Sequence, residues 1–195
     1  AFHLGDKNEE EKWKKIASAR KDEINRLMWD EKTGFFYDYG YVFKRQSDFL
    51  SLAGFVPLWA GLASPEQAAR VVKMLPKFET GYGLTITAKE SLAKPIDLKK
   101  IQKRFHPAIL DIITPKQWDY PNLWPPLEYL TTIGLLKYGF TDEAKRLMEK
   151  YVKTHSAFFR KHGTFAEKLN GETGEKADTF HYEMQQGFGW TNAAF

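Results

Sequence analysis

The segment QWDYPNLWPPLEYL, residues 117–130, brings together side chains that could support chemistry. An amide, a flat ring and a carboxylate follow one another where a helix is expected to begin, at Gln117, Trp118 and Asp119. Asn122 and Trp124 come shortly after them. A purely structural interpretation also fits, because Asp119 could cap the helix and the tryptophans could lie in the core.

Two further segments carry groups of the same kind. In TFAEKLN, residues 164–170, Glu167 is a candidate catalytic carboxylate at the end of a short strand, although it could equally be an exposed residue paired with Lys168. In GFGWTN, residues 187–192, two glycines flank Phe188 and permit close approach of the backbone, and Trp190 follows. The alternative for this segment is a tight turn before a helix.

The composition bounds the classes of function. Aromatic residues make up 15% of the 195-residue chain, with six Trp and fifteen Phe, and such an excess suits a sugar-binding cleft as well as a core. The net charge is only +4. The densest basic group, at 99–104, has the pattern of a solvated helix face, so no nucleic-acid partner is predicted.

The sequence predicts no metal site, no cofactor and no membrane span. It contains no cysteine, and its five histidines show no metal-ligand spacing. No apolar run approaches the roughly 20 residues that cross a bilayer, and the first residues lack the apolar region of a signal peptide. These features leave the compartment open, although the lack of cysteine fits a reducing one such as the cytoplasm.

The elements expected to position these groups are mostly helices. Helical spacing of apolar residues from Trp13 to Met28 predicts a helix that ends near Asp30. Extended chain follows over 34–43. Further helices are predicted in the following places: from Ser47 or Asp48 to Leu62, from Pro65 to about Leu75, over 96–105, from Pro121 to Lys137, from a cap at Thr141 onward, and from the GFGWTN segment to the end of the chain.

A helix, a glycine turn and an aromatic extended segment occur in that order twice, at 26–39 and at 158–170. Paired helices with irregular connections favour an all-α toroid of helical hairpins, with short β segments in loops that carry the site. About six to eight helices are expected here, whereas six hairpins contain twelve. The chain is therefore predicted to be a single domain, 1–195, that forms an incomplete part of such a ring.

The three segments, in this order and spacing, resemble the motifs of the trehalase family of inverting glycoside hydrolases. QWDYPNLWPP resembles the second motif, FAEK the segment that precedes the last motif, and GFGWTN the carboxyl-terminal motif. The stretch upstream of these motifs in the same family resembles two further segments of this chain, SARKDEINRLMWDEKTGFFYDY and PLWAGLAS. The resemblance implies an (α/α)6 toroid and a sugar substrate, most naturally α,α-trehalose.

The resemblance also implies roles for individual residues. It makes Glu167 the general base, which activates water on the face of the sugar opposite the leaving group. It places residues of the second and last motifs at the sugar pocket. These are Gln117, Trp118, Asp119, Asn122, Trp124, Phe188 and Trp190.

The family's general acid lies in a segment that has no counterpart here, so the acid is expected upstream of Ala1. The isolated chain is then predicted to be inactive, and to contact the missing part or itself through uncovered helix faces. The sequence also departs from the family pattern, because it lacks the usual glycines before Tyr182 and has Ala193 where glycine is common. Two alternatives therefore stay open: a toroid α-glucosidase or α-mannosidase, and a non-catalytic sugar-binding or interaction domain.

Overall fold

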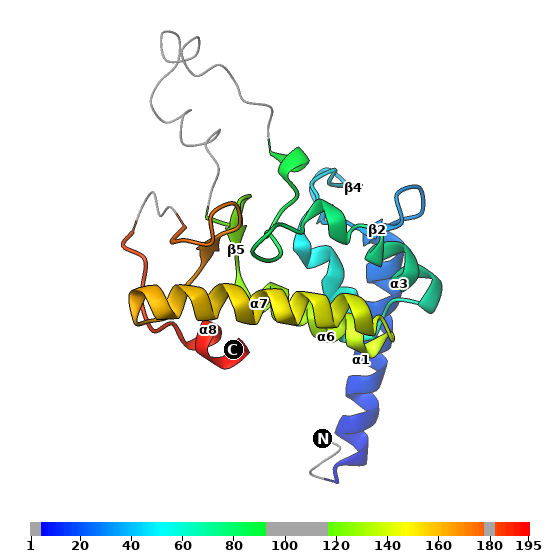
Figure 1. Ribbon diagram of the computed structural model, residues 1–195. Helices are drawn as coiled ribbons and strands as arrows, with labels where there is room; N and C mark the ends of the chain where they lie inside the picture. The colour runs from blue at the N-terminus through cyan, green and yellow to red at the C-terminus, as the bar shows by residue number, and fades with distance from the viewer. Residues whose placement is uncertain (1–4, 93–116, 178–181) are drawn as a thin grey trace.

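The computed structural model describes residues 5–92, 117–177 and 182–195, and over these ranges the protein is mainly helical (Figure 1). Three 3-10 turns supplement the helices, at Leu52–Phe55, Leu75–Lys77 and Lys89–Ser91. The described part contains six α-helices: α1 (Lys7–Met28), α2 (Val56–Ala60), α3 (Pro65–Val72), α6 (Pro125–Lys137), α7 (Thr141–His162) and α8 (Gly189–Ala194).

The described strands are two residues long and form three antiparallel pairs. These pairs are β1 (Trp29–Asp30) with β2 (Phe35–Phe36), β3 (Tyr39–Gly40) with β4 (Arg45–Gln46), and β5 (Asn122–Leu123) with β6 (Leu169–Asn170). The first two pairs join neighbouring segments, whereas the third connects two segments far apart in the chain. In β5–β6, Asn122 pairs with Asn170 and Leu123 with Leu169.

Local sequence signals explain several helix ends. Asp6 caps α1 by accepting the Glu9 N–H at 3.0 Å. Ser64 and Gln67 form a reciprocal capping box at the start of α3. α7 ends at Gly163, whose φ of +71° is a left-handed conformation that glycine adopts easily.

Three of the predicted helix starts are wrong. The helix expected from Ser47 or Asp48 begins at Leu52 as a 3-10 turn, with Ser51 as its cap, and becomes α2 at Val56. The helix expected from Pro121 begins at Pro125, because residues 122–123 pair with β6 instead. Thr141 is the first residue of α7 rather than its cap. The predicted helix at 96–105 lies outside the described residues.

The main apolar core lies between α2, α3, β2 and the adjoining parts of α6 and α7. Phe35, Phe55 and Phe78 are its centre, with ring centroids 5.4–6.0 Å apart. Gly134 lets α6 approach α2, since a Cβ there would lie 2.8 Å from the Trp59 nitrogen. A second, smaller core holds Leu123 and Leu169 at the β5–β6 pair.

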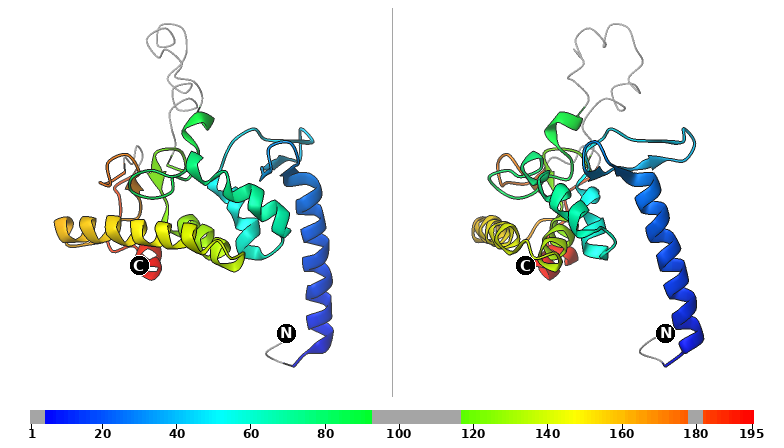
Figure 2. Two further views of the ribbon diagram at one scale, coloured as in Figure 1. Left: turned by 45° about the vertical axis from the view of Figure 1, so that its right-hand side comes forward. Right: turned by 90° about the vertical axis from the view of Figure 1, so that its right-hand side faces the viewer.

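α1 contributes little to this core. No residue of α1 is buried, and its first half extends away from the other helices in both views of Figure 2. Trp13 and Ile16 on that half are 56% and 41% exposed. Within the described residues, no helix combines the length and the apolar character needed to cross a membrane.

Glu128 is an acid buried within this helical framework, in the first half of α6. Its Oε1 accepts the Leu84 N–H at 3.1 Å, and its Oε2 has no hydrogen-bond partner among the described residues. Burial raises the pKa of Glu128 to about 8. The ordinary pKa of glutamate, which applies to the unfolded chain, is about 4.3. Between these two pKa values the carboxyl is therefore neutral in the folded protein and ionised in the unfolded chain.

We predict that Glu128→Gln flattens the pH dependence of stability. Because the pKa of Glu128 is raised in the folded protein, the wild-type free energy of unfolding should fall as pH rises from about 5 to 8, relative to that of the variant. The slope of this difference should be at most about 1.4 kcal/mol per pH unit. Urea unfolding at several pH values measures this. Glu11→Gln, at an exposed position of α1, is the control. Parallel curves for wild type and Glu128→Gln would contradict the prediction.

Candidate active site

The segment that carries Glu167 lies between the two other motifs. On one side, β6 pairs with β5 in the 117–124 segment. On the other side, the Glu167 N–H donates to the Gln185 carbonyl at 3.2 Å, and the Gly187 N–H donates to the Phe165 carbonyl at 2.8 Å. Backbone pairing thus assembles in space the three motifs that the sequence separates.

α8 fixes the backbone of this segment through two side chains. The Trp190 Nε1–H donates to the Glu167 carbonyl at 3.0 Å. The buried Thr191 hydroxyl donates to the Ala166 carbonyl at 2.7 Å. Two consecutive carbonyls therefore accept hydrogen bonds from two consecutive residues of one helix, which restricts rotation of the Glu167 peptide.

The two carboxylate oxygens of Glu167 have different surroundings. The side chain is 10% exposed. The Tyr182 hydroxyl donates to Oε2 at 2.6 Å, and the Lys168 Nζ lies 3.3 Å from the same oxygen. Oε1 accepts no hydrogen bond from a described residue. Within the described part of the chain, both contacts to this carboxylate are therefore made to one oxygen.

Lys168 is fully buried, which is rare for lysine unless it is paired. Its Nζ lies 5.0 Å from the centroid of the Trp124 ring and 4.5 Å from that of Tyr182, and it donates to the Tyr182 hydroxyl. Burial lowers the pKa of Lys168, while the negative charge of Glu167 opposes that shift. Burial, followed by the bond to Glu167, raises the pKa of Tyr182.

Four of the predicted pocket residues form a continuous series of rings. Trp118 stacks on Trp124 with centroids 3.8 Å apart and an angle of 9° between the rings. Trp124 meets Trp190 edge-on at 5.2 Å, and Trp190 lies 4.4 Å from Phe188. Trp118 is 45% exposed and Trp124 only 2%. Trp118 therefore offers a free surface to solvent, and Trp124 supports it from behind.

The other three predicted residues, Gln117, Asp119 and Asn122, are joined by hydrogen bonds within one loop. The Gln117 carbonyl accepts the Asn122 amide at 3.0 Å and the Trp124 indole N–H at 2.7 Å, while its side chain is exposed. The Asp119 carbonyl accepts the Asn122 N–H at 3.0 Å. These bonds fold residues 117–124 into a compact loop that orients Trp118 and Trp124.

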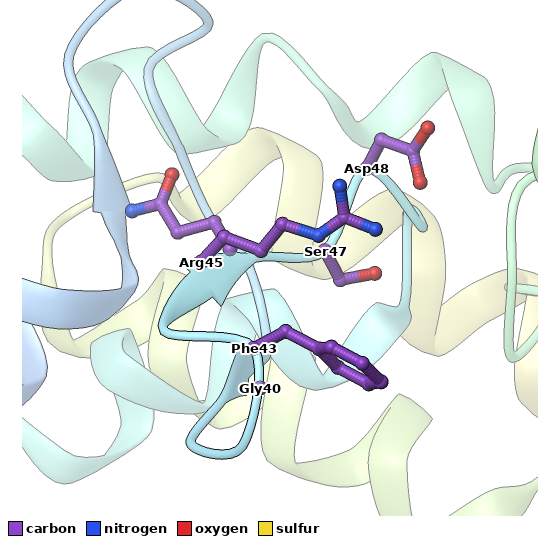
Figure 3. A pocket seen from close by; sticks show the side chains of 6 residues that line it. Gly40, Phe43, Arg45, Ser47 and Asp48 are labelled. Carbon is purple, nitrogen blue, oxygen red and sulfur yellow. The ribbon is translucent and has the colours of Figure 1, made fainter.

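A separate hollow of about 440 Å³ lies beside the β3–β4 hairpin (Figure 3). The Phe43 ring, the Arg45 guanidinium and the Asp48 carboxylate lie around it, with Gly40, Gln46 and Ser47 completing the lining. None of the predicted site residues lines it, so it is distinct from the Glu167 cluster.

Comparison with known proteins shows which family has this arrangement. The profile of the family described as Trehalase matches residues 1–195. The chain belongs to the trehalase family. The predicted family resemblance is therefore confirmed.

Relatives of this trehalase-family chain support the assignment. It is 36% identical to the cytosolic neutral trehalase of Beauveria bassiana and 33% identical to that of Saccharomyces cerevisiae, over 94% of this chain in both cases. The chain spans about a quarter of the length of these curated relatives, 24% of each.

Solved structures agree with the fold. The neutral trehalase Nth1 from Saccharomyces cerevisiae superposes with a TM-score of 0.71 at 31% identity, covering 93% of this chain and 29% of that one. A GH63 mannosylglycerate hydrolase from Thermus thermophilus superposes with a TM-score of 0.62 at 21% identity, covering 85% of this chain and 35% of that one, and bears on the fold alone. The predicted fold class, helical hairpins of a toroid with short β segments, is confirmed.

Three residues that contact the Glu167 segment are not predicted as site residues from the sequence. The sequence predicts Lys168 only as the partner of an exposed glutamate, places Tyr182 only beside the missing glycines, and predicts no role for Thr191. The adjacency of Glu167 and Lys168 was the available signal, but burial of the lysine depends on rings that lie 44 residues earlier and 14 residues later in the chain.

Proposed function

We propose that the full-length protein hydrolyses α,α-trehalose to free sugars with inversion, and that Glu167 is its general base. The observation that supports this most strongly is the asymmetry of the Glu167 carboxylate: Tyr182 and Lys168 hold Oε2, whereas no described residue donates to Oε1. A general base needs an ionised oxygen that water can reach, within a frame that keeps it directed.

In the proposed step, a water oxygen bonds to the anomeric carbon on the face opposite the leaving group. The water proton passes to Oε1 of Glu167 while the glycosidic C–O bond breaks, and a general acid gives its proton to the leaving oxygen. Inverting enzymes hold these two carboxyl groups about 6.5–9.5 Å apart. We place the acid on sequence outside this chain, and the step uses no metal or cofactor.

We propose that the sugar lies against the exposed ring of Trp118 and near Phe188. Trp118 is the ring of the aromatic series with the largest free face, and ring faces suit the flat faces of pyranoses. Trp124 and Trp190 act behind it, because one is buried beneath Trp118 and the other donates to the Glu167 carbonyl. Gln117, Asp119 and Asn122 complete the proposed sugar-binding set.

The Glu167 proposal predicts a selective loss of turnover. In the full-length protein, Glu167→Gln should lower kcat for trehalose by roughly 10²- to 10⁴-fold, the usual contribution of a general base. KM should change little, because the amide keeps the shape of the side chain. Glu175→Gln, at a solvent-facing carboxylate paired with Lys161, is the matched control and should retain wild-type activity.

Three results would count against parts of this account. Full activity in Glu167→Gln would exclude Glu167 as the base. Turnover by the 195-residue chain alone, abolished by Glu167→Gln, would show that the acid is not outside it. A full-length protein that is inactive on trehalose would leave the family assignment intact and refute the substrate.

We further propose that residues 1–195 are one part of a larger catalytic toroid in a cytosolic protein. The first part of this proposal is supported by the chain's coverage of only 24% of the length of its relatives, and the second by the word cytosolic in their names. Cell fractionation tests the location. In the full-length protein, the exposed Trp13 and Ile16 face of α1 would be covered by additional helices.

The exposed α1 face predicts that the 195-residue chain self-associates when alone. Light scattering should give a mass above the 22.6 kDa of a monomer, and Ile16→Lys should return the mass toward that value. Lys15→Gln, on the polar side of the same helix, should leave the assembly unchanged. A monomeric wild-type chain would argue against an uncovered interface.

A further inference from the structure

The surroundings of Lys168 differ from those of an ordinary surface ion pair. The side chain is 0% exposed, and its ammonium lies between the rings of Trp124 and Tyr182. Transfer of an ammonium group out of water is strongly unfavourable in free energy unless its charge is balanced. Two ring faces and one carboxylate supply that balance, and the carboxylate belongs to the proposed general base.

The contacts converge on a single oxygen. Lys168 and Tyr182 both reach Oε2 of Glu167, and Lys168 also donates to the Tyr182 hydroxyl, so the three polar groups form a closed triangle. An ion pair needed only for stability could use either carboxylate oxygen. Here both described donors reach the same oxygen, Oε2.

Trp118 and Trp124 link this triangle to the proposed sugar site. Trp124 lies beside the Lys168 ammonium and also stacks against Trp118. The ring on which we place the sugar therefore rests on the ring beside the ammonium. Trp124 therefore connects Lys168, which contacts the proposed base, with Trp118, the ring on which we place the sugar.

We propose that Lys168 and Tyr182 are positioning residues for Glu167: together they hold its carboxylate in one orientation through Oε2. The proposal rests on the proposed function of Glu167 as general base. A cation and a hydroxyl donor at the same oxygen restrict rotation of the carboxylate, and a general base acts best when its orientation is fixed.

Several other titratable groups lie on the segments around Glu167. On the described residues these are Asp119 and Tyr120 in the 117–124 segment, Glu172, Glu175 and Lys176 in the turn that pairs with β6, and Glu183 beside Tyr182. Among the described side chains, those that contact the Glu167 carboxylate are Lys168 and Tyr182.

The test separates kcat from KM for trehalose in the full-length protein. Lys168→Met keeps the length of the side chain and removes the charge, whereas Tyr182→Phe keeps the ring and removes one donor. Both should lower kcat at neutral pH by roughly tenfold or more, with KM within about twofold of wild type, because a misdirected base affects turnover and not sugar binding.

Two substitutions serve as matched controls. Lys145→Met removes an exposed lysine of α7, and Tyr129→Phe removes the hydroxyl of a half-exposed tyrosine of α6. Neither should lower kcat. If Lys168→Met does not fold, as judged by circular dichroism, Tyr182→Phe carries the test alone. A kcat that is unchanged in the folded variants, or a loss of kcat/KM that comes from KM alone, overturns the proposal.

A second measurement separates this proposal from the proposed function. In full-length protein with carboxyl-labelled glutamate, carbon-13 resonance reports on the Glu167 carboxyl group, and the signal that disappears in Glu167→Gln assigns it. Loss of a donor to Oε2 should change the chemical shift of this signal in Lys168→Met and in Tyr182→Phe, and not in Lys145→Met, whether or not trehalose is the substrate. An unchanged chemical shift refutes the positioning role, whereas a changed one in an enzyme inactive on trehalose refutes only the substrate.

Discussion

The hydrogen bonds from α8 to the carbonyls of Ala166 and Glu167 are the constraint on which the site depends. Trp190 and Thr191 hold this peptide from one side, and the pairing of β6 with β5 holds the next residues from the other. A catalytic side chain is useful only when its backbone leaves it few orientations. Here two elements from distant parts of the chain impose that restriction on Glu167.

Electrostatics then select among the orientations that remain. A fully buried lysine is stable only where its charge is compensated, and Glu167 is the carboxylate within reach. The rings of Trp124 and Tyr182 exclude water around the ammonium, which strengthens its attraction for Oε2. The same dry environment makes the arrangement sensitive, because loss of any one partner leaves another without compensation.

The motifs and the amphipathic helices could be predicted from the sequence because their signals are local. The capping box at Ser64 and the apolar face of α7 depend on residues three or four positions apart. The start of α6 was misplaced because residues 122–123 pair with residues 169–170, a long-range contact that helix signals do not encode. The role proposed for Glu167 comes from family resemblance, whereas the roles proposed for Lys168 and Tyr182 depend on contacts with Trp124 and Glu167 that form only after folding.

The central claim is that a carboxylate held in this way activates water for direct displacement at an α-linked anomeric carbon. The most direct measurement is proton magnetic resonance of the sugars that the full-length protein releases from trehalose before mutarotation. Inversion at one anomeric carbon should give α- and β-glucose in equal amounts, because the departing glucose keeps its own configuration. Release of α-glucose alone would indicate retention and would contradict the account.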